Sequence, residues 1–444
     1  MFVQNGMLEL SSRQRQILVL LRKGLSNNEI CSKLGITENT VKVHLRNIYK
    51  ILNVSNRIEA LNAANTLDIT EDDSPKELSV IFHKVSDISD CPKAYSLYLS
   101  LVEAIQQYRI FRILECGKKN DKPGLIIDVS ASKDEDEMLF VTTRIGSSDE
   151  ILWTTSIKAN SDNITSLAQK SAMQLFRSLV IASAKLNYTP DSPLPYWWFV
   201  TTRCIAGLES RSQESFEICK EKLTPFVVDS SYNEFTFYVL AYAYYIAILE
   251  NWGNPQLHAK ELANLARKAM VKTPCSIYTQ MIMALYNIAS GNKSEALAYL
   301  KHVVEANPQA ITARMILIQI YMLTNHEDEA LKLLDECTRL IPEMAMQASI
   351  NHARTFILLL QGKYEECRAL AKQVLLFTPK ALTVRLCLIL SDNMLGDLAD
   401  SRIQVKKFFE YNPKYGKKDL EQLLKGVSEE KKAFFMARLK NIFY

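Results

Sequence analysis

Residues 26–52 read SNNEICSKLGITENTVKVHLRNIYKIL, a stretch that carries the start and stop signals of two short helices. Ser26 and Glu29 have the spacing of a capping box, in which two side chains satisfy exposed backbone N–H groups at a helix start. Gly35 is suited to end this helix in a left-handed conformation, and Thr37 can cap a second helix that runs to about Leu52. The stretch therefore predicts two helices joined by a tight turn.

The second of these helices is predicted to have two different faces. Its apolar side chains recur at helical spacing and should pack inward: Val41, Leu45, Ile48 and Leu52. Cationic and polar side chains with one small apolar residue share the opposite face: Lys42, Val43, Arg46, Asn47 and Lys50. Cations reach phosphates and guanine edges, and a valine methyl packs on a thymine methyl, so this face suits a DNA major groove. A solvated basic face on an ordinary helix is the alternative, and the pattern alone leaves both open.

The flanking residues add a family resemblance. Residues 10–64 read LSSRQRQILVLLRKGLSNNEICSKLGITENTVKVHLRNIYKILNVSNRIEALNAA. This segment resembles the four-helix DNA-binding domain of LuxR/GerE-type transcriptional regulators through its LS-x-R opening and its GLSN-x-EI, LGIT, TVKVH and NRIEA runs. The segment departs from the family at Gln14 and Gln16, which replace common glutamates, and at Asn28, which replaces a cation that often contacts phosphate. The last change puts one phosphate contact in doubt.

The resemblance implies roles for individual residues. Lys42, Val43 and Arg46 occupy the positions that face bases in the family, and the helix-turn-helix unit spans about residues 26–45. The residues predicted to bind DNA lie at the start and on the exposed face of the second helix: Thr37, Asn39, Thr40, Lys42, Val43, Arg46, Asn47 and Lys50. The family also implies that the helix starting near Asn56 mediates dimerisation, with Ile58, Leu61 and Ala64 on one face. For Leu61 the alternative is an ordinary core position.

Composition places the whole chain among soluble globular proteins. Its 444 residues are enough for two or three domains, and 48% hydrophobic with 23% charged residues is ordinary. The net charge is +4, and residues 1–70 hold nine Lys or Arg against five Asp or Glu, which is the same excess of four. The positive charge therefore lies where the nucleic-acid signature lies.

Cysteine usage and hydropathy predict the compartment. The nine cysteines form no C-x-x-C and have no histidine at ligand spacing, which predicts reduced thiols and neither a disulfide framework nor a metal site. The longest apolar run, residues 236–249, has 14 residues, which favours a buried helix over a bilayer span. We therefore expect a cytoplasmic protein without a membrane segment.

Residues 79–190 predict a mixed α/β domain after a polar linker at 70–78. The order is strand, helix (94–108), strand (110–116), three further strands and a long helix (165–186), which indicates one sheet covered by helices. The pattern resembles a domain of some bacterial regulators that is related in fold to the N-terminal domain of TolB. The resemblance rests on residues 79–82, 151–158 and the final helix.

Two features of this domain invite a sharper interpretation. The acidic run Asp134–Glu137 could hold a cation, but it lacks the glycine and the spacing of a calcium loop, so a solvated hairpin tip is favoured. His83 stands near Asp87 and Asp90, and a surface histidine is favoured over a general base. No catalytic set, phosphate loop or cofactor motif is found, so an enzyme is not expected.

Residues 191–444 predict a helical repeat array. Small residues at Ala296, Ala330, Cys367 and Ser401 are each followed 12 residues later by a proline: Pro308, Pro342, Pro379 and Pro413. A turn residue stands five positions before each small residue: Gly291, Asn325, Gly362 and Gly396. The repeat lengths of 34, 37 and 34 resemble the period of the tetratricopeptide (TPR) family. Pro274 extends the register upstream, residues 197–273 add one or two degenerate repeats, and residues 416–444 predict capping helices.

Such an array presents a concave groove that usually holds a peptide or a protein helix. The tyrosines Tyr238, Tyr242, Tyr244 and Tyr245 could line that groove. The alternative, that they fill contacts between helices, is favoured because tyrosine is common in such cores.

The sequence therefore predicts a mainly α protein with four segments: an N-terminal four-helix helix-turn-helix domain (1–69), the linker (70–78), a small α/β domain (79–190) and an α-solenoid of TPR-like helix pairs (191–444). The predicted function is transcriptional regulation, in which the second helix reads the major groove of double-stranded DNA. Expected partners are DNA, a second copy of the chain on DNA, a protein or peptide in the TPR groove, and RNA polymerase. No catalytic residue, cofactor or metal is expected. The alternative is a TPR-based scaffold or adaptor in which DNA binding is secondary.

Overall fold

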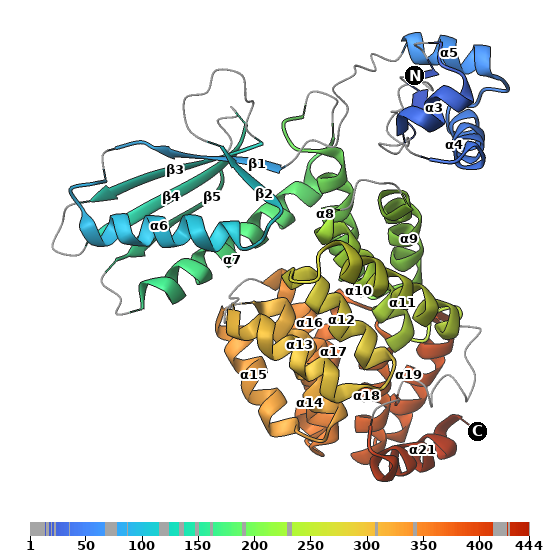
Figure 1. The fold of residues 1–444 in the computed structure, drawn as a ribbon. Helices are drawn as coiled ribbons and strands as arrows, with labels where there is room; N and C mark the ends of the chain where they lie inside the picture. Colours follow the sequence, from blue (N-terminus) through green and yellow to red (C-terminus); the bar gives the residue numbers. More distant parts are fainter. Residues whose placement is uncertain are drawn as a thin grey trace.

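The described part of the chain is mainly helical and contains a five-stranded sheet, as Figure 1 shows. The computed structural model describes residues 14, 17–18, 20–21, 24–34, 36–66, 78–86, 88–114, 124–132, 137–146, 151–159, 163–188, 192–228, 233–306, 310–340, 344–411, 424 and 427–443. A small helical region comes first, the sheet follows, and helix pairs form the C-terminal half. The predicted fold class is confirmed.

The N-terminal region contains helices α3 (Asn27–Leu34), α4 (Glu38–Ile51) and α5 (Arg57–Thr66). The capping box before α3 is confirmed: the Ser26 backbone N–H donates to Glu29 Oε2 at 2.7 Å, and the Glu29 N–H donates to Ser26 Oγ at 3.4 Å. The predicted left-handed turn at Gly35 lies outside the described residues. The backbone N–H of Ile36 nevertheless donates to the Cys31 carbonyl at 3.2 Å, a bond that spans the turn between α3 and α4.

A separate hydrophobic core holds these helices together. Its buried members come from α4 and from the segments before and after it: Ile17, Leu18, Leu20, Leu21, Ile30, Val41, Leu45, Ile48, Leu52 and Ala60. The predicted inward face of α4 is thus confirmed, because all four of its apolar side chains belong to this core. An apolar row at helical spacing fixes which side of α4 faces solvent.

The middle region is a five-stranded sheet in the order β2-β1-β3-β4-β5. Its strands are β1 (Leu78–Lys84), β2 (Phe111–Leu114), β3 (Leu125–Ser132), β4 (Met138–Ile145) and β5 (Ile151–Lys158). Strand β1 pairs in parallel with β2 and β3, while β3–β4 and β4–β5 are antiparallel. Helices α6 (Pro92–Gln106) and α7 (Ile164–Lys185) pack against each other and against the sheet. The predicted strands, helices and single sheet are confirmed.

The polar features singled out in this region have structural partners. Asp134, Glu135 and Asp136 lie outside the described residues, but Glu137 accepts the backbone N–H groups of Lys93 and Ala94 at 2.9 Å each. Glu137 thereby caps α6, whose own N-cap residue makes no side-chain cap.

His83 is 46% exposed, as expected of a surface histidine, and Asp87 lies outside the described residues. His83 Nδ1 lies 2.8 Å from Asp128 Oδ1, because strand register places these residues side by side on β1 and β3. Arg144 Nε also contacts Asp128, at 2.8 Å. Burial acts to raise the Asp128 pKa, but the hydrogen bonds from Arg144 and His83 outweigh it and hold that pKa below its usual value. The group is a sheet-surface ion pair.

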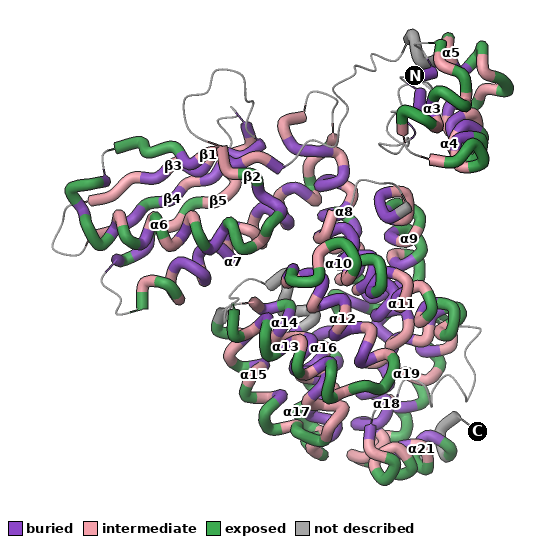
Figure 2. The backbone as a smooth tube through the Cα atoms, viewed as in Figure 1, coloured by how far each residue is buried: buried purple, intermediate pink, exposed green. Residues whose placement is uncertain are grey.

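Helix pairs make up the C-terminal half, and Figure 2 shows their buried inward faces. The pairs are α8 (Tyr196–Leu208) with α9 (Gln213–Val228), α10 (Glu234–Leu249) with α11 (Pro255–Lys272), α12 (Ile277–Ala289) with α13 (Lys293–Ala306), α14 (Ile311–Leu323) with α15 (Glu327–Leu340), α16 (Met344–Leu360) with α17 (Tyr364–Phe377), and α18 (Leu382–Met394) with α19 (Leu398–Tyr411). Helix α21 (Glu429–Phe443) packs on α18 and α19 at the end of the array. None of the helices within the described ranges combines the length and the apolar composition needed to cross a membrane.

The repeat register is confirmed at its turns. Gly291, Asn325, Gly362 and Gly396 all have positive φ, between 57° at Asn325 and 85° at Gly291, which is the left-handed conformation that ends a helix. The small residues Ala296, Ala330, Cys367 and Ser401 are all fully buried. Pro274 and Pro379 each follow a helix end by two positions, where a proline cannot continue the helix. Pro308, Pro342 and Pro413 lie outside the described residues.

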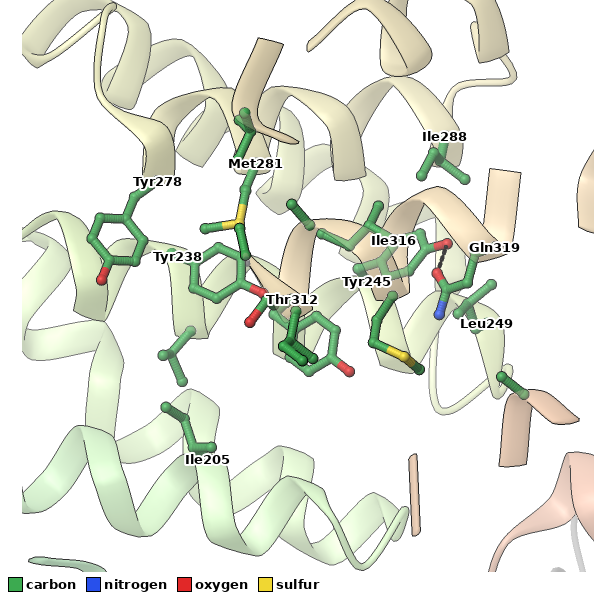
Figure 3. Close-up of a pocket in the computed structure, with 18 of the residues that line it drawn as sticks. Ile205, Tyr238, Tyr245, Leu249, Tyr278, Met281, Ile288, Thr312, Ile316 and Gln319 are labelled. Atoms are coloured by element: carbon green, nitrogen blue, oxygen red, sulfur yellow. Dashed lines mark hydrogen bonds between the residues drawn. The ribbon is translucent and has the colours of Figure 1, made fainter. Parts of the chain in front are cut away.

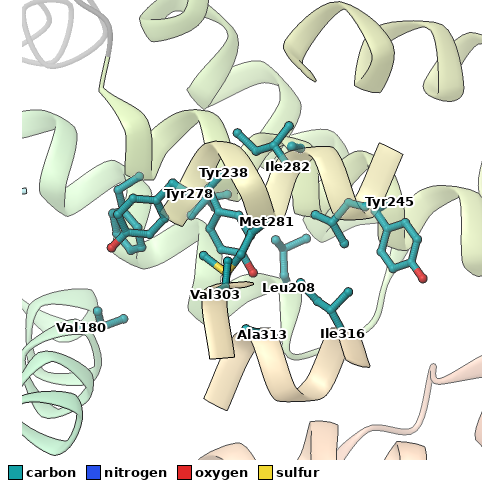
Figure 4. Close-up of a cluster of buried hydrophobic side chains, with 14 of the residues drawn as sticks. Val180, Leu208, Tyr238, Tyr245, Tyr278, Met281, Ile282, Val303, Ala313 and Ile316 are labelled. Atoms are coloured by element: carbon teal, nitrogen blue, oxygen red, sulfur yellow. The ribbon is translucent and has the colours of Figure 1, made fainter. Parts of the chain in front are cut away.

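The sheet and the first repeats share one hydrophobic core. The Phe176 ring of α7 lies 6.1 Å from Trp198 of α8 and 5.5 Å from Phe235 of α10, measured between ring centroids. Figure 4 shows this continuity, with Val180 of α7 facing a cluster from α8, α10, α12, α13 and α14. The core therefore includes residues on both sides of position 190, where the sequence predicts a domain border. The positions of the domain borders stay a prediction.

A buried carboxyl in α18 gives a testable pH effect. Asp392 is fully buried, and neither carboxyl oxygen has a hydrogen-bond partner among the described residues. Burial raises the Asp392 pKa from 3.8 to about 6; Lys372 and Arg368 oppose the rise, whereas Asp400 and Asp397 add to it. Because the pKa of Asp392 is higher in the folded than in the unfolded protein, this group adds to the free energy of unfolding below pH 3.8. That contribution is lost as the pH rises through about 6.

Asp392→Asn should therefore stabilise the protein by about 1–2 kcal/mol at about pH 8, because the amide removes the buried charge. At about pH 4 the same change should have almost no effect, since the carboxyl is already neutral. Urea unfolding of both proteins at the two pH values measures this difference. An equal gain at both values would show that the charge on Asp392 is not the cause.

Candidate nucleic-acid interface

Helix α4 begins with a side-chain cap. Thr37 is its N-cap residue, and the Thr37 hydroxyl accepts the Thr40 backbone N–H at 3.3 Å. The Thr37 and Thr40 hydroxyls also lie 2.8 Å apart. The cap fixes where α4 starts, and it leaves the positive end of the helix dipole facing solvent, where a phosphate would be favoured.

The structure brings all eight predicted DNA-binding residues together on α4 and its cap. Lys42, Arg46, Asn47 and Lys50 are exposed, as are Thr37 and Asn39, whereas Thr40 is half-buried. Val43 is 47% exposed, which is high for an aliphatic side chain and leaves its methyl groups available. The exposed row lies opposite the buried row of the same helix, so the domain core holds the basic face outward.

One contact of this face was not anticipated from the sequence. Lys42 Nζ lies 2.8 Å from Glu38 Oε1, and the two side chains are 57% and 50% exposed. Glu38 precedes Lys42 by four residues on one helix, a spacing from which the pair could have been inferred. An exposed pair of this kind contributes little and is screened by salt, so Lys42 can exchange Glu38 for a nucleic-acid acceptor.

Helix α5 supports the position of α3. Arg57 donates to the Leu25 carbonyl at 2.5 Å and to Asn27 Oδ1 at 3.4 Å, which joins the start of α5 to the start of α3. Glu59 accepts the Ser55 backbone N–H at 2.7 Å, a second local cap. The NRIEA run of the sequence supplies Arg57 and Glu59, so this motif serves to lock the helices together.

The predicted dimerisation face of α5 is partly open. Ile58 is 70% exposed, a large fraction for an isoleucine. Leu61 is half-buried and packs against the N-terminal core, so it is at least in part a core residue. The side chain of Ala64 lies outside the described residues. Of the two side chains of this set that the structure describes, Ile58 is the more open to a partner.

Comparison with known proteins agrees with these features. Residues 8–64 match the model of the LuxR family of bacterial regulatory proteins, and residues 287–346 match a tetratricopeptide repeat model. The chain is 52% identical over 56 residues to the CsgBAC operon transcriptional regulatory protein of Escherichia coli (strain K12), covering 13% of this chain and 26% of that protein. It is 41% identical over 58 residues to the HTH-type transcriptional regulator MalT of Vibrio campbellii, covering 13% of this chain and 6% of MalT.

The solved structure of a thermophilic TPR protein from Thermus thermophilus is similar at 19% identity and a TM-score of 0.33, over 47% of this chain and all of that one. The resemblance of the middle region to the N-terminal domain of TolB stays a prediction. The chain spans about a quarter or less of the length of the two curated relatives named above. The chain thus carries a LuxR-family helix-turn-helix domain at residues 8–64 and tetratricopeptide repeats in its C-terminal half.

Proposed function

We propose that this chain is a cytoplasmic, DNA-binding transcriptional regulator whose helix α4 enters the major groove. The observation that carries the proposal is the exposed row Lys42, Val43 and Arg46, held outward by a buried row on the same helix of a LuxR-family domain. The two relatives named above are transcriptional regulators that share this segment. In helix-turn-helix proteins the N-terminal half of the second helix contacts base edges.

The residues of this face divide into two roles. Arg46 can offer a planar fork to a guanine, Lys42 a point charge, and Val43 an apolar contact to a thymine methyl. Asn47 and Lys50 lie further along α4, where the helix leaves the groove and approaches the phosphates. Thr37, Asn39 and Thr40 lie at the start of α4, where a phosphate would accept hydrogen bonds at the helix N-terminus.

A direct test measures duplex binding by the full chain across a salt series. If Lys and Arg contact phosphates, the logarithm of the binding constant should fall linearly with the logarithm of salt, by about 0.9 for each phosphate neutralised. A chain that binds no duplex at low salt would favour the alternative role of a TPR adaptor. The middle and repeat regions would then carry the function without DNA.

The proposal includes a homodimer on DNA, because two half-sites one helical turn apart raise the affinity of a small domain. The exposed Ile58 side chain on α5 is the contact that we expect between the two copies.

Ile58→Glu should convert a complex of two chains per duplex into a weaker complex of one chain, since a charge would be buried at the interface. Sedimentation of the DNA complex measures this ratio.

Ser55→Glu is the matched control, because it places the same charge on an exposed residue just before α5. A wild-type complex with a single chain per duplex would refute the dimer.

The repeats are proposed to contact a protein partner, and RNA polymerase is one candidate. Capture of RNA polymerase by the full chain, on DNA and off it, tests that part separately.

A further inference from the structure

A cavity of about 590 Å³ lies where the sheet region meets the inner side of the repeats. Its walls come from α7, α8, α10, α12, α14 and α16, and Figure 3 shows Ile205, Met281, Ile316 and other lining side chains around it. Most lining residues are aliphatic or aromatic. The volume falls within the roughly 300–1,000 Å³ that is typical of small-molecule sites.

Hydrogen bonds between distant helices cross the inner side of the array beside this cavity. The Tyr245 hydroxyl donates to Gln319 Oε1 at 2.7 Å, and joins α10 to α14, as the dashed line in Figure 3 marks. The Thr383 hydroxyl donates to Glu250 Oε2 at 3.0 Å, and joins α18 to the end of α10. An α-helix with its side chains is about 10 Å across, so a peptide helix would have to break these bonds to enter. The cavity therefore suits a compact molecule.

Two tyrosine hydroxyls in the wall need a hydrogen-bond acceptor. Tyr238 and Tyr278 are 5% and 3% exposed, they both line the cavity, and neither hydroxyl has a partner among the described residues. Burial raises the pKa of both groups well above the usual value, so both stay protonated and able to donate. A buried hydroxyl without a partner is unfavourable, and a ligand oxygen would remove that cost.

Among the described lining residues, five are charged: Arg177, Glu209, Arg211, Glu250 and Lys293. Arg211 and Glu250 form an ion pair at 3.8 Å, Lys293 donates to the Leu323 carbonyl, and Arg177 and Glu209 also interact within the protein. Two buried N–H groups of Arg177, at Nε and Nη2, have no hydrogen-bond partner among the described residues, so these charges do not exclude an anionic ligand.

We propose that this cavity binds a largely apolar small molecule with a carbonyl or ether oxygen that accepts hydrogen bonds from the Tyr238 and Tyr278 hydroxyls. The ligand would contact α7 of the sheet region and helices of the array at once, so its binding stabilises their junction. The proposal does not rest on DNA binding, because the cavity is remote in sequence from α3, α4 and α5.

The test uses Prodan, a neutral naphthalene ketone whose emission reports polarity and hydrogen bonding at its carbonyl. Saturable binding to the full chain with blue-shifted emission is expected. Tyr238→Phe and Tyr278→Phe should each weaken binding roughly fivefold, the effect of one hydrogen bond. Both variants keep the ring and remove an unpartnered hydroxyl, so their unfolding temperatures without the probe should not fall.

A blocking variant shows whether the probe occupies this cavity. Thr312 is exposed and lines the cavity, and Figure 3 shows it beside Tyr238, so Thr312→Trp should prevent binding while the fold is kept. His302→Trp places the same side chain on an exposed position of α13 outside the wall and should bind Prodan normally.

Three outcomes would overturn the proposal. The first is the lack of saturable Prodan binding. The second is equal binding by the Thr312→Trp and His302→Trp variants, which would place the probe elsewhere. The third is wild-type affinity in both tyrosine variants, which would remove the hydrogen-bonding argument.

Discussion

Replacing Arg46 by alanine is expected to weaken binding to the preferred duplex by about 1–3 kcal/mol and to relax the preference at one base pair. Arg46 is exposed in the N-terminal two-thirds of α4, on the face opposite the domain core. A guanidinium fork that contacts a guanine discriminates between bases, so its loss should matter far less on a random duplex. Fluorescence anisotropy on preferred and random duplexes measures the two losses.

Lys50→Ala is the matched control on the same helix. Lys50 is also exposed but lies one turn further along, nearer the expected phosphates. This variant should weaken all duplexes alike and lower the salt slope by about one, because a phosphate contact releases a counterion without reading sequence. If both variants lose the same affinity on both duplexes, α4 is a generic basic face and does not read sequence.

Ala330→Leu is expected to destabilise the repeats by about 1–3 kcal/mol. Ala330 is fully buried in a cluster with Ile311, Ile318 and Ile350, at the crossing of α15 with its neighbours. The three added carbon atoms have no space there without displacement of a helix or distortion of a rotamer. Thermal or urea unfolding of the full chain measures the change.

Lys332→Leu is the control for that substitution, because Lys332 is exposed on the same helix. It adds a leucine to α15 without crowding the core and should change stability by less than about 0.5 kcal/mol. If the Ala330→Leu protein unfolds at the same temperature and urea concentration as the wild type, the small residue is not required at this crossing.

Local patterns predicted the parts of the fold that depend on neighbouring residues. The spacing of Val41, Leu45 and Ile48 was enough to identify the buried side of α4, since helix geometry alone sets it. The turn residues of the repeats were found in the same way. Gly362 and Asn325 take left-handed backbone conformations that few other residues adopt without strain.

Contacts between distant segments could not be predicted in this way. The Tyr245–Gln319 and Thr383–Glu250 bonds join positions 74 and 133 residues apart, and the curvature of the whole array brings them together. His83 shows the same limit on a smaller scale, because strand register and not sequence proximity gave it Asp128 as a partner. The cavity depends on all of these placements, so the sequence singled out Tyr238, Tyr242 and Tyr245 only as possible groove residues and did not single out Tyr278.

If α4 reads a DNA sequence, selection from a random duplex pool by the full chain should enrich a defined motif in two half-sites about one helical turn apart. The Arg46→Ala protein should then lose the preference at one position of each half-site. Retained duplexes with no enriched motif, or the same motif enriched equally by the Arg46→Ala protein, would contradict sequence reading by α4.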